Sequence, residues 1–158
     1  MIIRTADLNS QRDLQDVISG ARAFLEQSGV MGGVQVDSSS LESTMWELLN
    51  IPAVTVIAAE VDKKLVGGIG VSCGPWMWNK NVLFCEELFW WVQDGAPIKA
   101  AHKLFNAAME FIEETRNGQI ARISFTCLES SPGGVARLYE RWGMERTGAF
   151  YMMTEGYH

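Results

Sequence analysis

The sequence predicts a mixed α/β domain, and three observations support this fold class. The segment 54–73 holds two runs rich in β-branched and small apolar residues around a short turn, which predicts an antiparallel hairpin. The segment 82–92 is apolar on both faces near its end, as is typical of a central strand. An amphipathic stripe over 98–116 predicts a helical crossover, and such a crossover favours parallel pairing of strands 82–92 and 119–128.

The N-terminal third predicts one short strand and two helices. Ile2 and Ile3 begin the strand. The first helix follows from apolar residues at helical spacing, namely Leu14, Val17, Ile18, Ala21, Phe24 and Leu25. Serines 38–40 are expected to cap the second helix, and Pro52 ends that region.

The middle of the chain predicts strands at 54–61 and 65–73 with a turn at 62–64, followed by a longer turn over 74–81. The second strand carries three glycines, Gly67, Gly68 and Gly70. Glycine weakens a strand, so this placement indicates the close approach of a backbone or a ligand.

The C-terminal half predicts a helix, a strand, a short helix and a final hairpin. Pro97 suits the first position of the helix, and Asn117-Gly118 ends it. Strand 119–128 precedes a short helix over 135–142, and segment 144–156 is expected to form the hairpin. The predicted order is β-α-α-β-β-β-α-β-α-β-β, in a single domain spanning residues 1–158.

Composition and charge exclude several function classes. The net charge of −6 and the lack of a basic block argue against nucleic-acid binding. No apolar run approaches the roughly 20 residues that span a bilayer, and the N-terminus lacks the apolar core of a signal peptide. We therefore expect a cytoplasmic protein with no membrane partner.

The cysteines and histidines are few and scattered. There are 3 Cys and 2 His residues, with no CxxC pair, so neither a disulfide framework nor a structural metal site is expected. Cys73, Cys85 and Cys127 are interpreted as small core residues. Cys127 is a weak candidate nucleophile, because no histidine is placed by sequence to activate it.

The segment between strand 82–92 and the next helix is a candidate anion site. A helix N-terminus presents free N–H groups and partial positive charge. Lys99, His102 and Lys103 would suit a bound anion there, or they are solvent-facing residues. Asp94 is an alternative occupant, since its carboxylate can cap the helix itself.

Two motifs carry a family resemblance, "ELFWWV" at 87–92 and "LYERWGM" at 138–144. With the element order, they resemble the GNAT superfamily of N-acetyltransferases, and most closely the acetyltransferase-like proteins of bacteriophages. The resemblance implies acetyl-CoA as the donor, a primary amine as the acceptor and no metal. It also implies a splayed sheet with the donor wedged between the strand before the phosphate loop and the strand after its helix.

The phosphate loop departs from the family pattern R/Q-x-x-G-x-G/A. Aligned on Leu104, its positions fall at Ala96, Lys99 and Ala101, of which only Ala101 fits. The backbone N–H of Val92 is the expected partner of the thioester carbonyl. The resemblance implies these cofactor-binding residues: Trp91, Val92, Lys99, Ala100, Ala101, His102 and Lys103.

The same resemblance implies the catalytic residues. Tyr139 lies at the tyrosine of the "LY" motif, which in many members protonates the leaving thiolate. Glu86 and Glu87 lie on the strand where members often place a general base. Strand alternation sends them to opposite faces, so one of them faces the cleft unless a bulge intervenes. A core-edge tyrosine and surface carboxylates are the alternative interpretation.

The sequence leaves two functions open. One is acetyl transfer from acetyl-CoA to an unidentified amine by direct attack. The alternative is a catalytically weak or inactive GNAT-like binding protein of phage origin, acting in the host cytoplasm on a host enzyme, favoured by the altered loop and the aromatic cluster Trp76-Met77-Trp78. The family also implies a monomer or a homodimer.

Overall fold

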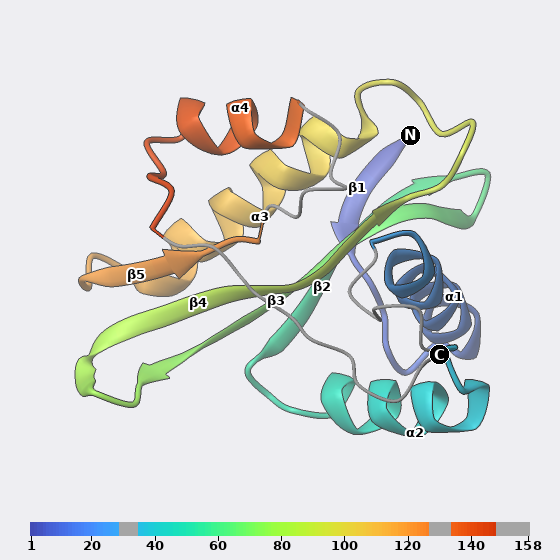
Figure 1. Cartoon of the computed structure of the whole chain (residues 1–158), viewed down its shortest axis with the longest axis horizontal. Helices are drawn as coiled ribbons and strands as arrows, with labels where there is room; N and C mark the ends of the chain where they lie inside the picture. Colours follow the sequence, from blue (N-terminus) through green and yellow to red (C-terminus); the bar gives the residue numbers. More distant parts are fainter. Residues whose placement is uncertain (29–34, 127–133, 148–158) are drawn as a thin grey trace, which may run out of the picture.

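The computed structural model describes residues 1–28, 35–126 and 134–147. Within them, one five-stranded sheet has the order β1-β2-β3-β4-β5 (Figure 1). The strands are β1 (Ile2–Thr5), β2 (Val54–Val61), β3 (Lys64–Trp76), β4 (Asn79–Val92) and β5 (Ala121–Ser124). The first four pair antiparallel, and β5 runs parallel to β4, which confirms the predicted mixed sheet.

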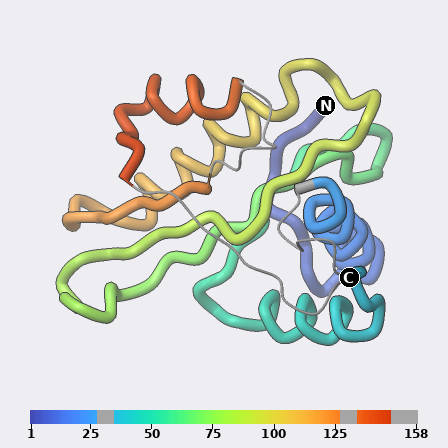
Figure 2. Tube along the Cα trace, in the orientation of Figure 1, coloured from blue at the N-terminus to red at the C-terminus, as the bar shows by residue number. Residues whose placement is uncertain are grey.

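Helices cover both faces of the sheet. Helices α1 (Gln11–Ser28) and α2 (Ser38–Leu49) lie on one face, and α3 (Ala100–Arg116) and α4 (Gly134–Arg141) lie on the other (Figure 1). The tube in Figure 2 shows the β3–β4 hairpin extending beyond these helices at one end of the sheet. Among the described residues, no helix is long and apolar enough to cross a bilayer.

Several predicted boundaries are wrong by a few residues. The predicted turn over 74–81 is a turn of two residues, Met77 and Trp78, because the β3–β4 ladder continues almost to the tip. Of the predicted strand 119–128, the described residues 119–126 are regular only at Ala121–Ser124, because pairing with β4 stops there. Asn117, with φ 43°, does end α3 in the left-handed conformation, as predicted.

The helix starts also differ from the predictions. Helix α2 is capped by Asp37, whose side chain accepts from the Ser40 N–H, while the serines form its first turn. Helix α3 begins at Ala100 rather than at Pro97. Of the predicted final hairpin, residues 144–147 have no regular structure, and the remainder lies outside the described residues.

The glycines of β3 make room for aromatic rings of β4. A Cβ on Gly68 would lie 2.2 Å from the Trp91 ring, and one on Gly70 would lie 2.6 Å from the Phe89 ring. From the opposite side, a Cβ on Gly20 of α1 would lie 2.1 Å from Trp91. The close approach expected at these glycines is therefore that of core side chains at Gly68 and Gly70, and at Gly67 that of the backbone, because a Cβ there would lie 3.0 Å from the Trp91 carbonyl oxygen.

An ion-pair network joins α1 to the sheet edge. The fully buried Asp13 carboxylate accepts from the Arg4 guanidinium at 2.6 Å, from Arg12 at 2.9 Å and from the Asp7 N–H at 3.0 Å. Arg4 also donates to Glu60 on β2. These hydrogen bonds, chiefly that from Arg4, hold the pKa of Asp13 well below its usual range.

We expect Asp13→Asn to lower the free energy of unfolding at pH 7 by about 2 to 3 kcal/mol, because it leaves buried donors without their anion. The folded-state pKa of Asp13 is depressed, so its contribution is complete above the unfolded value of about 4 and is lost as the pH falls. Urea unfolding from pH 7 to pH 3 measures this. Asp94→Asn, at an exposed position, is the control. Equal decreases in the free energy of unfolding of both variants would contradict the prediction.

Candidate functional site

A β-bulge in β4 determines which side chains reach the α3–α4 face. Val71 pairs with Glu87 while Gly70 pairs with Phe89, so Leu88 is an extra residue on β4. Leu88 and Phe89 both pack on the α1–α2 side. Cys85 and Glu87 therefore face α3 and α4 before the bulge, and Trp90 faces them after it.

Glu87 is the carboxylate that this arrangement places inside the protein. Its Oε2 accepts from the Tyr139 hydroxyl at 3.2 Å and from the Thr126 N–H at 3.2 Å. Among the described residues, no cation forms an ion pair with it. Burial raises the pKa of Glu87 to about 7, and the hydrogen bonds from Thr126 and Tyr139 oppose this rise. Glu87 therefore titrates near neutral pH.

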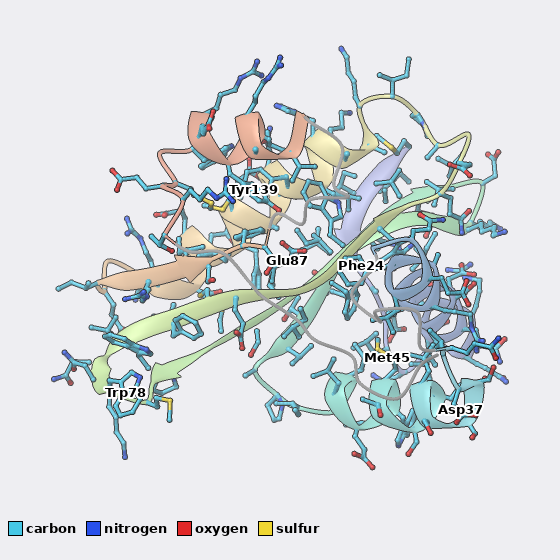
Figure 3. All side chains as sticks on the ribbon, in the orientation of Figure 1. Phe24, Asp37, Met45, Trp78, Glu87 and Tyr139 are labelled. Atoms are coloured by element: carbon cyan, nitrogen blue, oxygen red, sulfur yellow. The ribbon has the colours of Figure 1, made fainter. Side chains whose placement is uncertain are left out.

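Tyr139 reaches Glu87 from α4, across the divergence of β4 and β5. Its hydroxyl also lies 3.1 Å from the Thr126 carbonyl, so one proton has two possible acceptors. Its ring packs 5.4 Å from Phe105 and 5.5 Å from Phe125, measured between centroids. These rings keep the hydroxyl and the carboxylate in an apolar surrounding. Figure 3 shows Glu87 and Tyr139 facing each other between β4 and α4.

Glu86 is not part of this pair. It is exposed on the opposite face of β4, as strand alternation requires, and only Glu87 meets Tyr139. The structure thus distinguishes two neighbours that the sequence left as equal alternatives.

The sheet opens directly beyond Glu87. Pairing of β4 with β5 ends at Glu86 and Ser124. The Gln93 N–H donates to the Val66 carbonyl of β3, so neighbouring Val92 directs its own N–H away from β3, toward the side that β5 has left. The Trp90 indole N–H is buried on the same face without a partner in the described part of the chain. The resemblance predicts a splayed sheet with the donor at this place, between β4 and β5.

The N-terminus of α3 is uncapped and electropositive. Its N-cap residue is Lys99, with no side-chain cap hydrogen bond, so Asp94 does not cap the helix. No acidic residue lies in the first turn. Lys99, His102 and Lys103 are exposed, whereas Ala101 is half-buried and Ala100 is buried.

Other expected site residues lie apart from this opening. Trp91 is only 5% exposed and packs in the core on the α1 face. Cys127 lies outside the described residues. In the part of the chain that the structure describes, no group of three or more Cys, His, Asp or Glu residues is arranged to hold a metal ion.

The sequence analysis did not identify Thr126, or the contact of the Phe105 and Phe125 rings with Tyr139. Thr126 fixes the Glu87–Tyr139 pair through its backbone N–H and C=O, and any residue supplies those groups, so no sequence signal marks it. Phe105 and Phe125 were expected only as members of a helix stripe and a strand. Their contact with Tyr139 depends on how α3, β5 and α4 pack.

The fold is that of the GNAT acetyltransferases. A ribosomal-protein-alanine N-acetyltransferase from Brucella melitensis aligns over 98% of this chain and 99% of its own, with 17% identity and a TM-score of 0.66. A predicted acetyltransferase from Clostridium acetobutylicum, solved with acetyl-CoA, aligns over 99% of both chains with 15% identity and a TM-score of 0.70.

An aminoglycoside acetyltransferase from an uncultured soil metagenomic sample also aligns, over 98% of this chain and 96% of its own, with 19% identity and a TM-score of 0.63. No protein-family model and no curated protein sequence matches this chain. The three structural matches establish the fold, and none of them bears on a phage origin or on a host target.

Proposed function

We propose that this protein is an N-acetyltransferase that moves an acetyl group from acetyl-CoA to a primary amine by direct attack. The observation that carries the proposal is the hydrogen-bonded Glu87–Tyr139 pair, placed where β4 and β5 diverge. A carboxylate with a pKa of about 7 is matched to proton abstraction at neutral pH.

Glu87 is the general base in this mechanism. It accepts the proton that the amine loses as its nitrogen attacks the thioester carbonyl. The Val92 N–H polarises that carbonyl oxygen, because it points to the side away from β3, where residues 1–28, 35–126 and 134–147 provide no strand to pair with it. The C–S bond then breaks, and the Tyr139 hydroxyl donates its proton to the leaving sulfur. Tyr139 recovers a proton from Glu87 through the 3.2 Å hydrogen bond, so the pair returns to its starting state.

The residues at the start of α3 fit a pyrophosphate group. The first-turn N–H groups have no side-chain cap, and Lys99, His102 and Lys103 supply positive charge around them. Gly95, with φ 80° and open space around its α-carbon, permits close backbone approach in the preceding loop. In place of the family's central glycine, Lys99 contributes charge. Acetyl-CoA, when bound, supplies the activated acetyl group.

Acetyl transfer tests the proposal directly. Purified protein with acetyl-CoA and a panel of primary amines, including aminoglycosides and peptides with a free N-terminus, should release free thiol in step with acetylated amine. Release of thiol without an acetylated product, or no reaction with any amine by a chain that binds acetyl-CoA, would count against an N-acetyltransferase.

Charge reversal at the start of α3 should weaken acetyl-CoA binding. We expect the wild-type protein to bind with a Kd in the micromolar range, about −8 kcal/mol, and Lys99→Glu to raise the Kd at least roughly tenfold. Isothermal titration calorimetry measures both. Lys80→Glu is the matched control, because Lys80 lies at the other end of β4, about 40 Å from Val92. Equal Kd values in the two variants would exclude this anion site.

A second candidate function rests on the tip of the β3–β4 hairpin. Met77 and Trp78 are 77% and 76% exposed, and Figure 3 shows Trp78 at the far end of the hairpin. Large exposed apolar side chains at a protruding tip suit contact with another protein. We propose a binding protein as the alternative if millimolar acetyl-CoA produces no heat of binding. In that case Trp78→Ala should abolish capture of a partner that Lys80→Ala retains.

A further inference from the structure

Two cysteines lie directly opposite each other on neighbouring strands. Cys73 of β3 pairs with Cys85 of β4. The Cys73 N–H donates to the Ala53 carbonyl at 2.9 Å, so its backbone groups face β2 rather than β4. The Leu83 N–H donates to Ile120, and Cys85, two residues farther along, faces the same side as Leu83. Both observations make Cys73 and Cys85 a non-hydrogen-bonded antiparallel pair.

A non-hydrogen-bonded pair places two cysteines within bridging reach. Its α-carbons lie about 4.5 Å apart with both side chains on one face of the sheet. A disulfide spans α-carbons roughly 4.4 to 6.8 Å apart, so no backbone movement is required. Cys85 is a small core residue, as the sequence predicted, whereas Cys73 is only half-buried.

The two thiols are not equivalent. Cys73 is half-buried, whereas Cys85 is fully buried. The neighbouring Cys85 thiol lowers the pKa of Cys73, against the effect of burial, whereas the neighbouring Cys73 thiol and burial both raise the pKa of Cys85. Cys73 is therefore the accessible nucleophile, and Cys85 is the thiol behind it.

We propose that Cys73 and Cys85 form a reversible dithiol–disulfide site that a small disulfide oxidant of the glutathione type closes. The Cys73 thiolate attacks the oxidant, forming a mixed disulfide and releasing one thiolate. The Cys85 sulfur then attacks the Cys73 sulfur, its proton passes to the departing group, and the second thiol leaves. The cysteine pair loses two electrons, and the oxidant is reduced to two thiols.

The site adjoins the Glu87–Tyr139 pair but does not depend on its function. Cys85 precedes Glu87 by two residues on the same face of β4 and packs in the same apolar cluster as Tyr139. Closing the bridge joins β3 to β4 just before the bulge. The cross-link also shortens the free chain of the unfolded state, which stabilises the fold.

The test uses the full chain carrying Cys127→Ala, so that the only remaining thiols are those of the pair. Incubation with oxidised glutathione should lower the intact mass by about 2 Da, with proteolysis joining the Cys73 and Cys85 peptides, and reduced glutathione should reverse it. Oxidation should raise the thermal midpoint by roughly 5 °C. Cys73→Ser should prevent both the mass decrease and the rise in the thermal midpoint. Cys85 should stay unmodified in this variant, because Cys85 is buried.

Two outcomes would overturn the proposal. One is a stable mixed disulfide at Cys73 beside a free Cys85 thiol. The other is no change in mass across glutathione ratios while urea-unfolded protein reacts at both thiols. Neither readout involves acetyl transfer, so failure here is distinguishable from failure of the proposed acetyltransferase activity.

Discussion

Glu87→Gln should reduce kcat/KM for acetyl transfer by roughly 100- to 1000-fold, because the amide cannot accept the proton of the amine. In the wild type, kcat/KM should rise with pH through about 7, where burial places the pKa of Glu87. In Glu87→Gln this rise near pH 7 should be absent, and kcat/KM should change with pH only through the titration of the amine substrate. Steady-state kinetics from pH 5.5 to pH 9 measure both effects.

Glu86→Gln is the matched control for this prediction. The two glutamates are neighbours on β4, but Glu86 is exposed and Glu87 accepts from Tyr139. Glu86→Gln should keep the wild-type rate and pH profile. Tyr139→Phe should lower kcat roughly tenfold to 100-fold while preserving the ring contacts. A Glu87→Gln enzyme with the wild-type pH profile would remove Glu87 from the mechanism.

The thermal stability of Glu87→Gln distinguishes loss of the general base from loss of folding. The folded-state pKa of Glu87 is raised, so ionisation of this group disfavours the fold as the pH rises from the unfolded value of about 4.3 through about 7. Below that window the effect vanishes. Glu87→Gln removes the buried charge, and its thermal midpoint at pH 8 should equal or exceed that of the wild type. A large decrease at pH 8 would show a structural role instead.

Gly68→Ala should cost at least about 2 to 3 kcal/mol of unfolding free energy. The new Cβ would lie 2.2 Å from the Trp91 ring, and that ring is held on its other side by Gly20 of α1. The indole therefore cannot move away without displacing the helix. Gly20→Ala should destabilise for the same reason, although alanine favours a helix over glycine by about 1 kcal/mol. Chemical denaturation measures each variant.

Gly74→Ala is the control on the same strand. A Cβ at Gly74 meets nothing within 4 Å, so this variant should be neutral or slightly stabilising. Combining Gly68→Ala with Trp91→Leu should recover part of the loss suffered by Gly68→Ala, relative to Trp91→Leu alone. Additive losses in the double variant would show that the ring contact is not the cause.

The altered phosphate loop shows where pattern matching and physical chemistry diverge. By pattern, Lys99 in place of glycine and Ala96 in place of arginine or glutamine indicate a lost site. By charge, an uncapped helix start surrounded by Lys99, His102 and Lys103 remains suited to an anion. Titration with acetyl-CoA decides between these interpretations.

Local sequence patterns determined most of the architecture. Apolar spacing predicted α1 and α3, β-branched runs predicted the β2–β3 hairpin, and Asn117-Gly118 predicted the end of α3. These signals succeed because amphipathic periodicity and left-handed caps depend on residues close together in the chain. Alternation likewise required Glu86 and Glu87 to occupy opposite faces.

Only the tertiary structure decided which chemistry those elements bring together. The selection of Glu87 depends on Tyr139 and on the backbone of Thr126, which lie far along the chain. The meeting of Cys73 and Cys85 depends on strand register across a hairpin whose turn length was mispredicted. Register, bulges and burial arise from packing between segments that are distant in the chain. Local sequence patterns therefore identify the candidate residues but not the contacts between them.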